Sequence, residues 1–218
     1  MPRLVFEKIG NAVWISHLDL MRLFQRAFKR AGLPLKHTQG YNPRPSVSIA
    51  LPLSVGTQSH CELLDFDLEG EILNCDEIRE KLNDALIDGI AVRQVYVSGR
   101  KLRELSHLSC SMKLEYDEEL EDNVTKIQEL FGQQILTVIK RTKNGPVEQN
   151  IIPMIKKLTV EYCNRHTVTI NALISCQNPS LNPMQLVGAI EQYLPDLTPN
   201  YVSCSRLELY DQNEQIFR

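Results

Sequence analysis

The sequence predicts a mixed α+β protein built from two domains in tandem. Short apolar runs typical of strands alternate with amphipathic segments of helical spacing, and the same order of segments occurs once in each half of the chain. The 218 residues suffice for two domains of about 100 residues each. Because 43% of the residues are apolar, each half can bury a core of its own.

The first half begins with a segment in which apolar and polar residues alternate, from Arg3 to Ile15. A Gly-Asn pair lies within it, so we expect a strand or a tight hairpin. Ser16 is predicted to cap a helix, with Asp19 reaching back three residues in a capping-box arrangement. The helix is expected to stop at Gly32, because glycine is common just past a helix end and Pro34 follows.

Four further elements complete the first half. Strand-like runs occur at Ser46–Leu51 and Cys61–Leu68, and Asn74 is placed to cap a second helix that ends before Gly89. A last strand is predicted at Ile90–Val97. The resulting order, β-α-β-β-α-β, is the ferredoxin-like split pattern.

A short polar segment, residues 98–101, is the expected linker, which gives domains at residues 1–99 and 106–218. The second half repeats the order of the first, with one addition, so we predict two ferredoxin-like domains in tandem. Its predicted elements are strands at 108–116, 135–141, 155–163, 168–175 and 201–210, helices at 118–131 and 183–194, an extra strand or arm at 147–152, and a turn at 143–146.

The cysteines do not predict a metal or cofactor site. No pair has Cys-x-x-Cys spacing, and the nearest approach to a ligand pair, Cys163 with His166, is interpreted as a strand end leading into a turn. A phosphate-binding glycine loop, a dinucleotide fingerprint and a nucleophile elbow are all missing from the sequence. We therefore expect no metal and no cofactor, with reduced and mostly buried thiols at Cys61, Cys75, Cys110, Cys163, Cys176 and Cys204.

The same composition predicts a cytoplasmic protein that does not enter the membrane. Apolar runs stay below the roughly 18 residues that a membrane span requires. The irregular spacing of the cysteines is unlike a secreted disulfide scaffold.

Charge is unevenly distributed along the chain. Residues 61–100 contain four basic and ten acidic side chains, a balance of −6, whereas the first 60 residues have a balance of +6. A concentrated positive field favours an anionic partner at the N-terminal surface, unless the two stretches lie close together and cancel. Within residues 1–60 the acidic residues are Glu7 and Asp19, and the basic residues are Arg3, Lys8, Arg22, Arg26, Lys29, Arg30, Lys36 and Arg44.

The first predicted helix has a basic face. Arg22, Arg26, Lys29 and Arg30 follow one another at spacings of four, three and one, opposite the apolar positions. Side chains so arranged can follow a phosphate backbone, and they make binding salt-dependent. A merely solvated helix face has the same pattern, so both interpretations stay open.

The segment Gly40–Pro45 is the candidate binding loop, and it follows Lys36. Its two prolines hold the backbone extended, and Gly40 permits an unusual turn before Tyr41. An exposed Tyr41 beside Asn42 and Arg44 can stack on a base and bond its edge or its phosphate. The alternative is a rigid crossover with Tyr41 packed into the core.

Two histidines lie near this surface, His17 at the helix start and His37 after Lys36. Histidine titrates near neutrality, so either residue is a candidate for acid–base work in metal-independent RNA cleavage. Otherwise His17 is expected to bond the neighbouring loop.

Several motifs of the first 65 residues resemble those of a bacterial radical-SAM-associated family of unknown function, whose members occur alone or fused to cobalamin-binding-type radical SAM proteins. The resemblance extends to the rest of the chain in length and pattern, with a weak similarity of sequence at residues 206–210. The motifs are Arg3-Leu-Val-Phe-Glu-Lys-Ile-Gly10, Ile15-Ser-His-Leu-Asp-Leu-Met-Arg22, Arg26-Ala-Phe-Lys-Arg-Ala-Gly-Leu-Pro34, Gly40-Tyr-Asn-Pro-Arg-Pro45 and Ala50-Leu-Pro-Leu-Ser-Val-Gly56.

The resemblance implies a partner, a cobalamin-binding-type radical SAM protein, because this chain lacks the Cys-x3-Cys-x2-Cys signature of such an enzyme. The leading hypothesis is a non-catalytic accessory module that binds RNA or another anionic substrate for that partner. Two alternatives are a metal-independent ribonuclease that uses His17 or His37, and a protein-only adaptor for an acidic partner surface.

Overall fold

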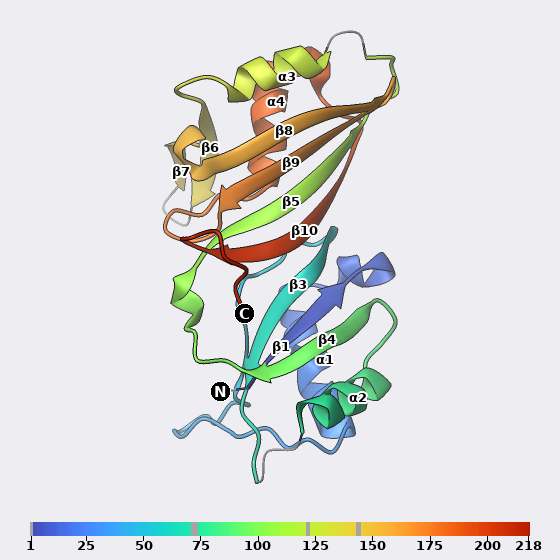
Figure 1. Cartoon of the computed structure of the whole chain (residues 1–218), viewed down its shortest axis with the longest axis vertical. Helices are drawn as coiled ribbons and strands as arrows, with labels where there is room; N and C mark the ends of the chain where they lie inside the picture. The colour runs from blue at the N-terminus through green and yellow to red at the C-terminus, as the bar shows by residue number, and fades with distance from the viewer. Residues whose placement is uncertain (1, 71–73, 121–122, 143–144) are drawn as a thin grey trace. The chain divides into compact units, whose positions relative to one another are not determined.

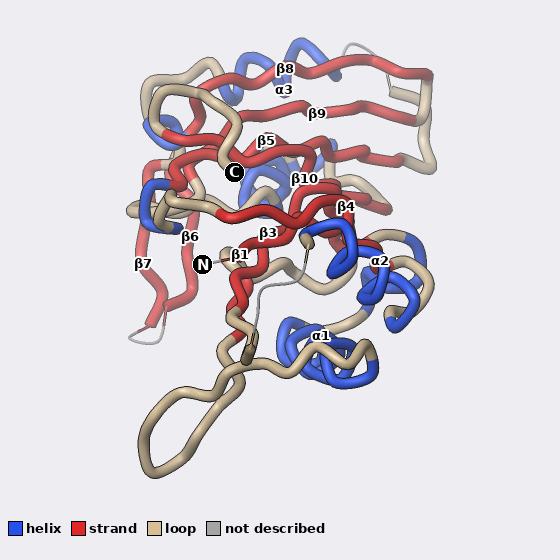
Figure 2. The backbone as a smooth tube through the Cα atoms, turned by 60° about the horizontal axis from the view of Figure 1, so that its bottom comes forward, coloured by secondary structure: helices blue, strands red, loops and turns tan. Residues whose placement is uncertain are grey.

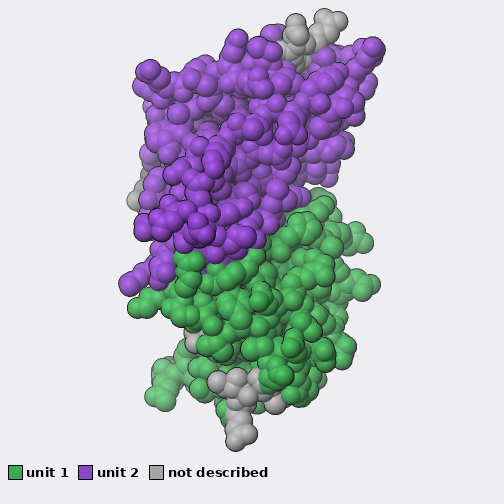
Figure 3. Space-filling view, viewed as in Figure 1, with its two compact units in different colours: residues 1–102, 218 green, residues 103–217 purple. Residues whose placement is uncertain are grey.

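The computed structural model describes residues 2–70, 74–120, 123–142 and 145–218, and it is a mixed α+β fold, as the sequence predicts. The chain divides into two compact units, residues 1–102 with 218, and residues 103–217 (Figure 3). Lys143 and Asn144, half of one predicted turn, lie outside the described residues. Within the described ranges, no helix is both long enough and apolar enough to cross a membrane.

The first unit contains an antiparallel sheet of order β4-β1-β3-β2 with two helices (Figure 1). Its elements are β1 (Pro2–Lys8), a 3-10 helix η1 (Gly10–Trp14), α1 (His17–Arg30), β2 (Val47–Ile49), β3 (Thr57–Phe66), α2 (Cys75–Ala85) and β4 (Ile90–Val97).

Both helices of this unit share one core with the sheet, and Figure 2 shows α1 and α2 side by side. Phe24 of α1 meets Phe6 of β1 with ring centroids 4.7 Å apart, and Phe28 meets Phe66 of β3 at 5.0 Å. All four rings are fully buried. Aromatic side chains of this size dominate the energetics of a core, so they fix which face of α1 turns inward.

The helix α1 begins and ends at the expected signals. The Ser16 hydroxyl accepts a hydrogen bond from the Asp19 backbone N–H at 3.2 Å, which satisfies one open donor of the first turn. At the other end Gly32 has φ +68°, and Leu33 N–H donates to Phe28 C=O at 2.9 Å. This is a Schellman motif, for which glycine is the favoured residue.

The predicted strand or hairpin over residues 3–15 is wrong in its second part. β1 ends at Lys8, and η1 follows after Gly10, whose φ is +56°. The buried Lys8 ammonium donates hydrogen bonds to the carbonyls of Val13 and Ile15 at 3.0 and 2.8 Å, and these side-chain bonds hold the chain in a turn where a strand was expected. Periodicity alone does not reveal that contact.

An irregularity in β4 shows how α2 supports the sheet edge. The register with β1 shifts between Val5 and Phe6, leaving Arg93 as an extra residue of β4. The Asn83 side chain of α2 bonds both the N–H and the C=O of Val92, at 2.8 and 3.0 Å. Arg93 is thereby directed to the buried Glu7, whose carboxylate its Nε reaches at 2.9 Å.

The second unit has an antiparallel sheet with the equivalent order, β10-β5-β9-β8. The segment predicted as an extra strand or arm is β7, which pairs with β6 in a separate two-stranded sheet. Its elements are β5 (Leu105–Glu115), α3 (Asn123–Phe131), β6 (Thr137–Thr142), β7 (Gly145–Asn150), β8 (Ile155–Asn164), β9 (Thr167–Ser175), α4 (Met184–Tyr193) and β10 (Tyr201–Asp211), with short 3-10 turns at Leu102–Glu104, Ile152–Met154 and Pro195–Leu197.

Strand alternation separates the two faces of this second sheet. Cys110 and Met112 of β5, which are buried, lie opposite Ala172 and Ile170 of β9, whereas Ser111 pairs with Asn171 on the other face. The buried thiols include Cys110, Cys176 and Cys204, and burial raises their pKa values to about 12, about 11 and about 11.

The thiols should differ sharply in reactivity. Cys163 is exposed, whereas the raised pKa values of the three buried thiols keep them protonated at neutral pH, and the thiolate is the reactive form. Brief alkylation of the native protein at pH 8, read by peptide mass spectrometry, is expected to modify Cys163 first. Modification of Cys110 at the rate of Cys163 would contradict the described packing.

Candidate functional site

The basic residues of α1 lie on its exposed face. Arg22, Arg26, Lys29 and Arg30 are all exposed, while Phe24, Ala27 and Phe28 face the core. This is the arrangement expected when an amphipathic helix covers a sheet. The exposed face borders two hollows that share Arg26.

The smaller hollow, of about 450 Å³, lies beside the first turns of α1. Its charges are partly used within the protein: Arg22 pairs with Asp19 at 2.9 Å. Bonds from the Ser16 hydroxyl and from Arg22 lower the pKa of Asp19. Arg30 donates to the Ala85 carbonyl at the end of α2. The full lining is Ile15, Asp19, Arg22, Leu23, Arg26, Arg30 and Ile87.

The larger hollow, of about 590 Å³, lies at the C-terminal end of α1 and is mainly apolar with a polar rim. Within the described chain, the side chains of its five polar lining residues make no hydrogen bond or ion pair, so their polar groups are available to a ligand. These five residues are Gln25, Arg26, Lys29, His37 and Glu69, and the rest of the lining is Phe28, Gly32, Leu33, Pro34, Leu35 and Pro45.

The loop that follows α1 is tied at its base and open at its tip. His37 and Pro45 form a bridge, and Thr38 and Arg44 exchange two hydrogen bonds, at 2.8 and 3.0 Å. Tyr41 is fully exposed, which shows that the alternative of a core-packed Tyr41 is wrong. The segment is drawn as loop in Figures 1 and 2.

The remaining loop residues are exposed as well. Asn42 lies in the open part of the loop and Arg44 at its tied base, and the exposure of both agrees with a binding role without establishing one. Lys36 at the base is exposed but pairs with Asp67 at 3.4 Å.

The two candidate histidines are not brought together. His17 begins α1, whereas His37 lines a hollow beside Gln25, Arg26 and Lys29 of the second half of that helix. The expected bond from His17 to the neighbouring loop is not formed: its enclosed Nδ1 has no partner among the described residues. His37, in contrast, lines the larger hollow beside Arg26 and Lys29.

The acidic stretch of residues 61–100 is mostly paired outside these hollows. Asp65 binds Arg3 at 2.6 Å, and Glu77 pairs with Lys81 within α2. Glu69 is the acidic side chain of this stretch that lines the larger hollow. Lys36 is paired with Asp67, and Glu69 brings one negative charge of the acidic stretch into the hollow that Arg26 and Lys29 line.

Cys163 and His166 make separate contacts. Cys163 Sγ lies 3.2 Å from the Thr169 hydroxyl, and His166 Nδ1 lies 3.2 Å from the Tyr116 carbonyl oxygen. Over the ranges that the structure describes, no group of three or more histidine, cysteine, aspartate or glutamate side chains is arranged to hold a metal ion.

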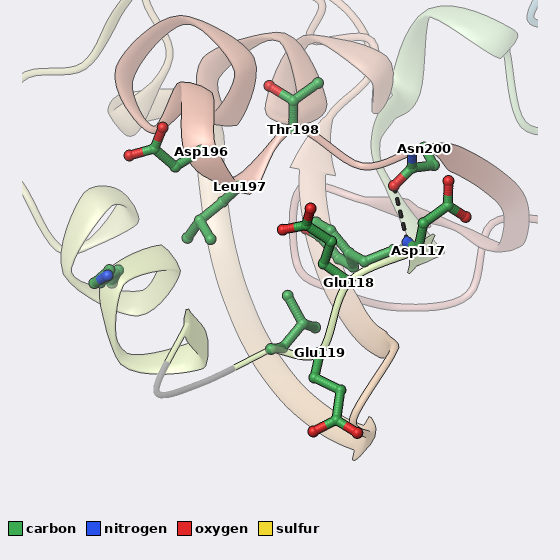
Figure 4. A pocket seen from close by; sticks show the side chains of 10 residues that line it. Asp117, Glu118, Glu119, Asp196, Leu197, Thr198 and Asn200 are labelled. Carbon is green, nitrogen blue, oxygen red and sulfur yellow. Dashed lines mark hydrogen bonds between the residues drawn. The ribbon is translucent and has the colours of Figure 1, made fainter.

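A third hollow belongs to the second unit and is acidic. Its volume, about 760 Å³, exceeds that of either hollow beside α1, which keep the names smaller and larger hollow. Asp117, Glu118, Glu119 and Asp196 line it, and Figure 4 shows their carboxylates spread around the space instead of converging on one point. The dashed bond in Figure 4 joins the Asp117 N–H to Asn200 Oδ1 at 3.0 Å. The four carboxylates make this third hollow unsuited to an anion.

Two lining residues of the larger hollow were not predicted from the sequence. Gln25 lies four residues before Lys29, so helical spacing places it on the basic face. It was not predicted because its side chain is neutral and the prediction rested on charge. Glu69 follows β3, and only the tertiary fold brings it near α1.

The fold and these hollows define a mixed α+β protein with an accessible basic helix face. The chain belongs to a family described as "Uncharacterized protein conserved in bacteria (DUF2344)", whose model matches residues 2–183. No curated protein matches the chain.

Among solved structures, the chain is similar to one in the crystal structure of a Cbf5-Nop10-Gar1 complex, with a TM-score of 0.53 and 6% identity. The match covers 95% of this chain and 48% of that chain, so this protein spans about half its length. At this identity the likeness concerns the fold alone.

Two further structures align over nearly the whole chain but superpose poorly. An unknown protein from Galdieria sulphuraria gives a TM-score of 0.27 at 8% identity, covering 94% of this chain and 96% of that one. A putative glycine cleavage system transcriptional repressor gives 0.25 at 12% identity, covering 97% and 98%.

Arg26 and Arg30 of α1 should respond differently to neutralisation. Arg30→Gln removes the bond to the Ala85 carbonyl and is expected to lower the free energy of unfolding by about 1 kcal/mol. Arg26→Gln breaks no hydrogen bond or ion pair that the structure shows and should change it by less than about 0.5 kcal/mol. Urea denaturation of both variants tests this, and an equal loss for Arg26→Gln would show that its side chain has a structural role.

Proposed function

We propose that this protein is a non-catalytic accessory module whose first unit binds RNA or another anionic substrate for a cobalamin-binding-type radical SAM partner. The observation that carries the proposal is the larger hollow beside α1. Among the described residues, the side chains of Arg26 and Lys29 make no hydrogen bond or ion pair, and they line, together with Glu69, an apolar depression of about 590 Å³, a size within the range of ligand sites.

Charge and shape support this function together. Arg26 and Lys29 can contact phosphates, while Pro34 and Pro45, which line the same hollow and are accessible, offer apolar surface to a flat ring. Tyr41, fully exposed on the loop that leaves the same helix, offers a second stacking surface.

The strand orders support a finer description of the fold. In each unit the sheet order and antiparallel pairing are those of a β-α-β-β-α-β chain, so we assign two ferredoxin-like domains in tandem. Similarity of fold does not define function, and the proposal therefore rests on the side chains of α1.

The partner is inferred from the motifs of residues 3–65, which resemble those of radical-SAM-associated proteins. A cytoplasmic location agrees with such a partner and with the free thiols of the described cysteines.

Neutralising one unpaired charge should weaken RNA binding measurably. For a single-stranded RNA, Arg26→Gln is expected to reduce the slope of log K against log salt by about 0.7, the value for one lost phosphate contact. Lys126→Gln is the matched control, because Lys126 is also an exposed cation but lines the acidic hollow of the second unit. Fluorescence anisotropy with labelled RNA measures both.

Tyr41→Ala belongs to the same series. It should weaken binding by about 1–3 kcal/mol without changing the slope, because stacking releases no counterions. Absence of RNA affinity in low salt, or equal effects of Arg26→Gln and Lys126→Gln, would overturn the RNA proposal and favour the protein-only adaptor.

The partner proposal has its own test. Co-expression with a cobalamin-binding-type radical SAM protein from the same bacterium should yield a complex that co-elutes in size-exclusion chromatography. Separate elution of the two proteins at micromolar concentration, with and without RNA, would remove this partner while leaving the RNA-binding proposal intact.

A further inference from the structure

The turn before α1 presents an exposed tryptophan on an unusually well-anchored backbone. Trp14 ends η1 and is 65% exposed, and it is the sole tryptophan of the chain. Tryptophan has a large apolar surface that proteins usually keep largely out of water. A rigid, exposed ring is therefore a candidate contact surface.

The anchor is the buried ammonium of Lys8. Its Nζ donates to the carbonyls of Val13 and Ile15, the residues on either side of Trp14, at 3.0 and 2.8 Å. Lys8 is only 1% exposed, and burial lowers its pKa. A buried charge is costly unless it is well bonded, and here its hydrogen bonds fix the backbone that carries Trp14.

Two glycines complete the anchoring. Gly56 N–H donates to Val13 C=O at 2.9 Å, and a Cβ at position 56 would lie 3.4 Å from the six-membered ring of Trp14. Gly89 C=O accepts from Ile9 N–H at 2.8 Å, and a Cβ at position 89 would lie 2.4 Å from the Ile9 oxygen. The ring thus lies against Gly56, and the turn has little freedom to move.

The surroundings of the ring combine apolar and basic groups. Val55, next to Gly56, and Leu18, in the first turn of α1, are 55% and 68% exposed. Ile15, the residue after Trp14, lines the smaller hollow together with Arg22 and Arg26. An aromatic ring one residue away from a hollow lined by arginines offers the two kinds of contact that single-stranded nucleic acids use, since their bases stack and their phosphates pair with cations.

We propose that Trp14 is a preorganised stacking platform for an unpaired base, which makes the α1 surface selective for single-stranded RNA over duplex. The inference rests on the RNA-binding function proposed above. α1 then has a stacking residue before its first turn, Trp14, and another after its last, Tyr41, with phosphate contacts between them. Bases within a duplex are already stacked and paired, so a duplex can use the cations but not Trp14.

A protein partner fits the patch less well. Even taken together, the exposed side chains of Trp14, Leu18 and Val55 offer little apolar surface, whereas a stable protein interface buries about 800 Å² on each side. A single base needs only the face of one ring, and holding that ring in place before binding reduces the entropic cost of association.

Because Trp14 is the sole tryptophan, its fluorescence reports directly on the platform. Titration with a single-stranded RNA should quench the emission in parallel with the anisotropy of the labelled RNA, and a duplex of equal length should bind with little quenching. Trp14→Ala should weaken single-strand binding roughly 5- to 150-fold and leave duplex binding unchanged. Trp14→Phe, which keeps a smaller ring, should retain part of the affinity.

Ile135→Ala is the matched control, because Ile135 of the second unit is as exposed as Trp14, at 67% against 65%, but has no ring and lies outside the proposed surface. It should bind single-stranded RNA as the wild type does. Two results together would overturn the platform alone and assign the patch to a protein contact. Trp14→Ala would bind RNA as tightly as the wild type, and RNA would leave the emission of the wild-type protein unquenched. Failure of the wild type to bind any RNA by anisotropy would overturn the proposed function and the platform with it.

Discussion

The packing of α1 on its sheet determines where every candidate group of the first unit lies. Phe24 and Phe28 are held by Phe6 and Phe66, so the helix cannot rotate without removing two large rings from the core. The four basic side chains are consequently fixed on the outer face. A loss of this packing would therefore disperse the four charges.

The elements that could be predicted from the sequence are those whose signals are local. Ser16 and Gly32 define the ends of α1 because capping chemistry depends on neighbouring residues, and β4 follows its predicted range because alternation and turns suffice. η1 was missed because its cause is a long side chain returning from Lys8, which no periodicity reports.

The candidate site likewise has some features that local sequence predicts and others that depend on the tertiary fold. The exposure of Arg22 and Arg26 follows from the helical period alone, whereas the pairing of Lys36 with Asp67 and the bond from Arg30 to Ala85 depend on chain segments distant in sequence. Charge counting treats these cations as equivalent. Among the described residues, Arg22, Arg30 and Lys36 have partners, whereas the side chains of Arg26 and Lys29 make no hydrogen bond or ion pair. A mutational test should therefore begin with Arg26 and Lys29.

The loop that carries Tyr41 is closed at its base by the His37–Pro45 bridge and the paired bonds of Thr38 and Arg44. Residues 39–43 therefore contribute little to the stability of the unit, and substitutions or small insertions there leave the sheet and α1 undisturbed. Under the proposed binding function, a change at this tip could alter ligand preference without altering the sheet or α1. The proposed binding loop and the scaffold that supports it can thus vary independently.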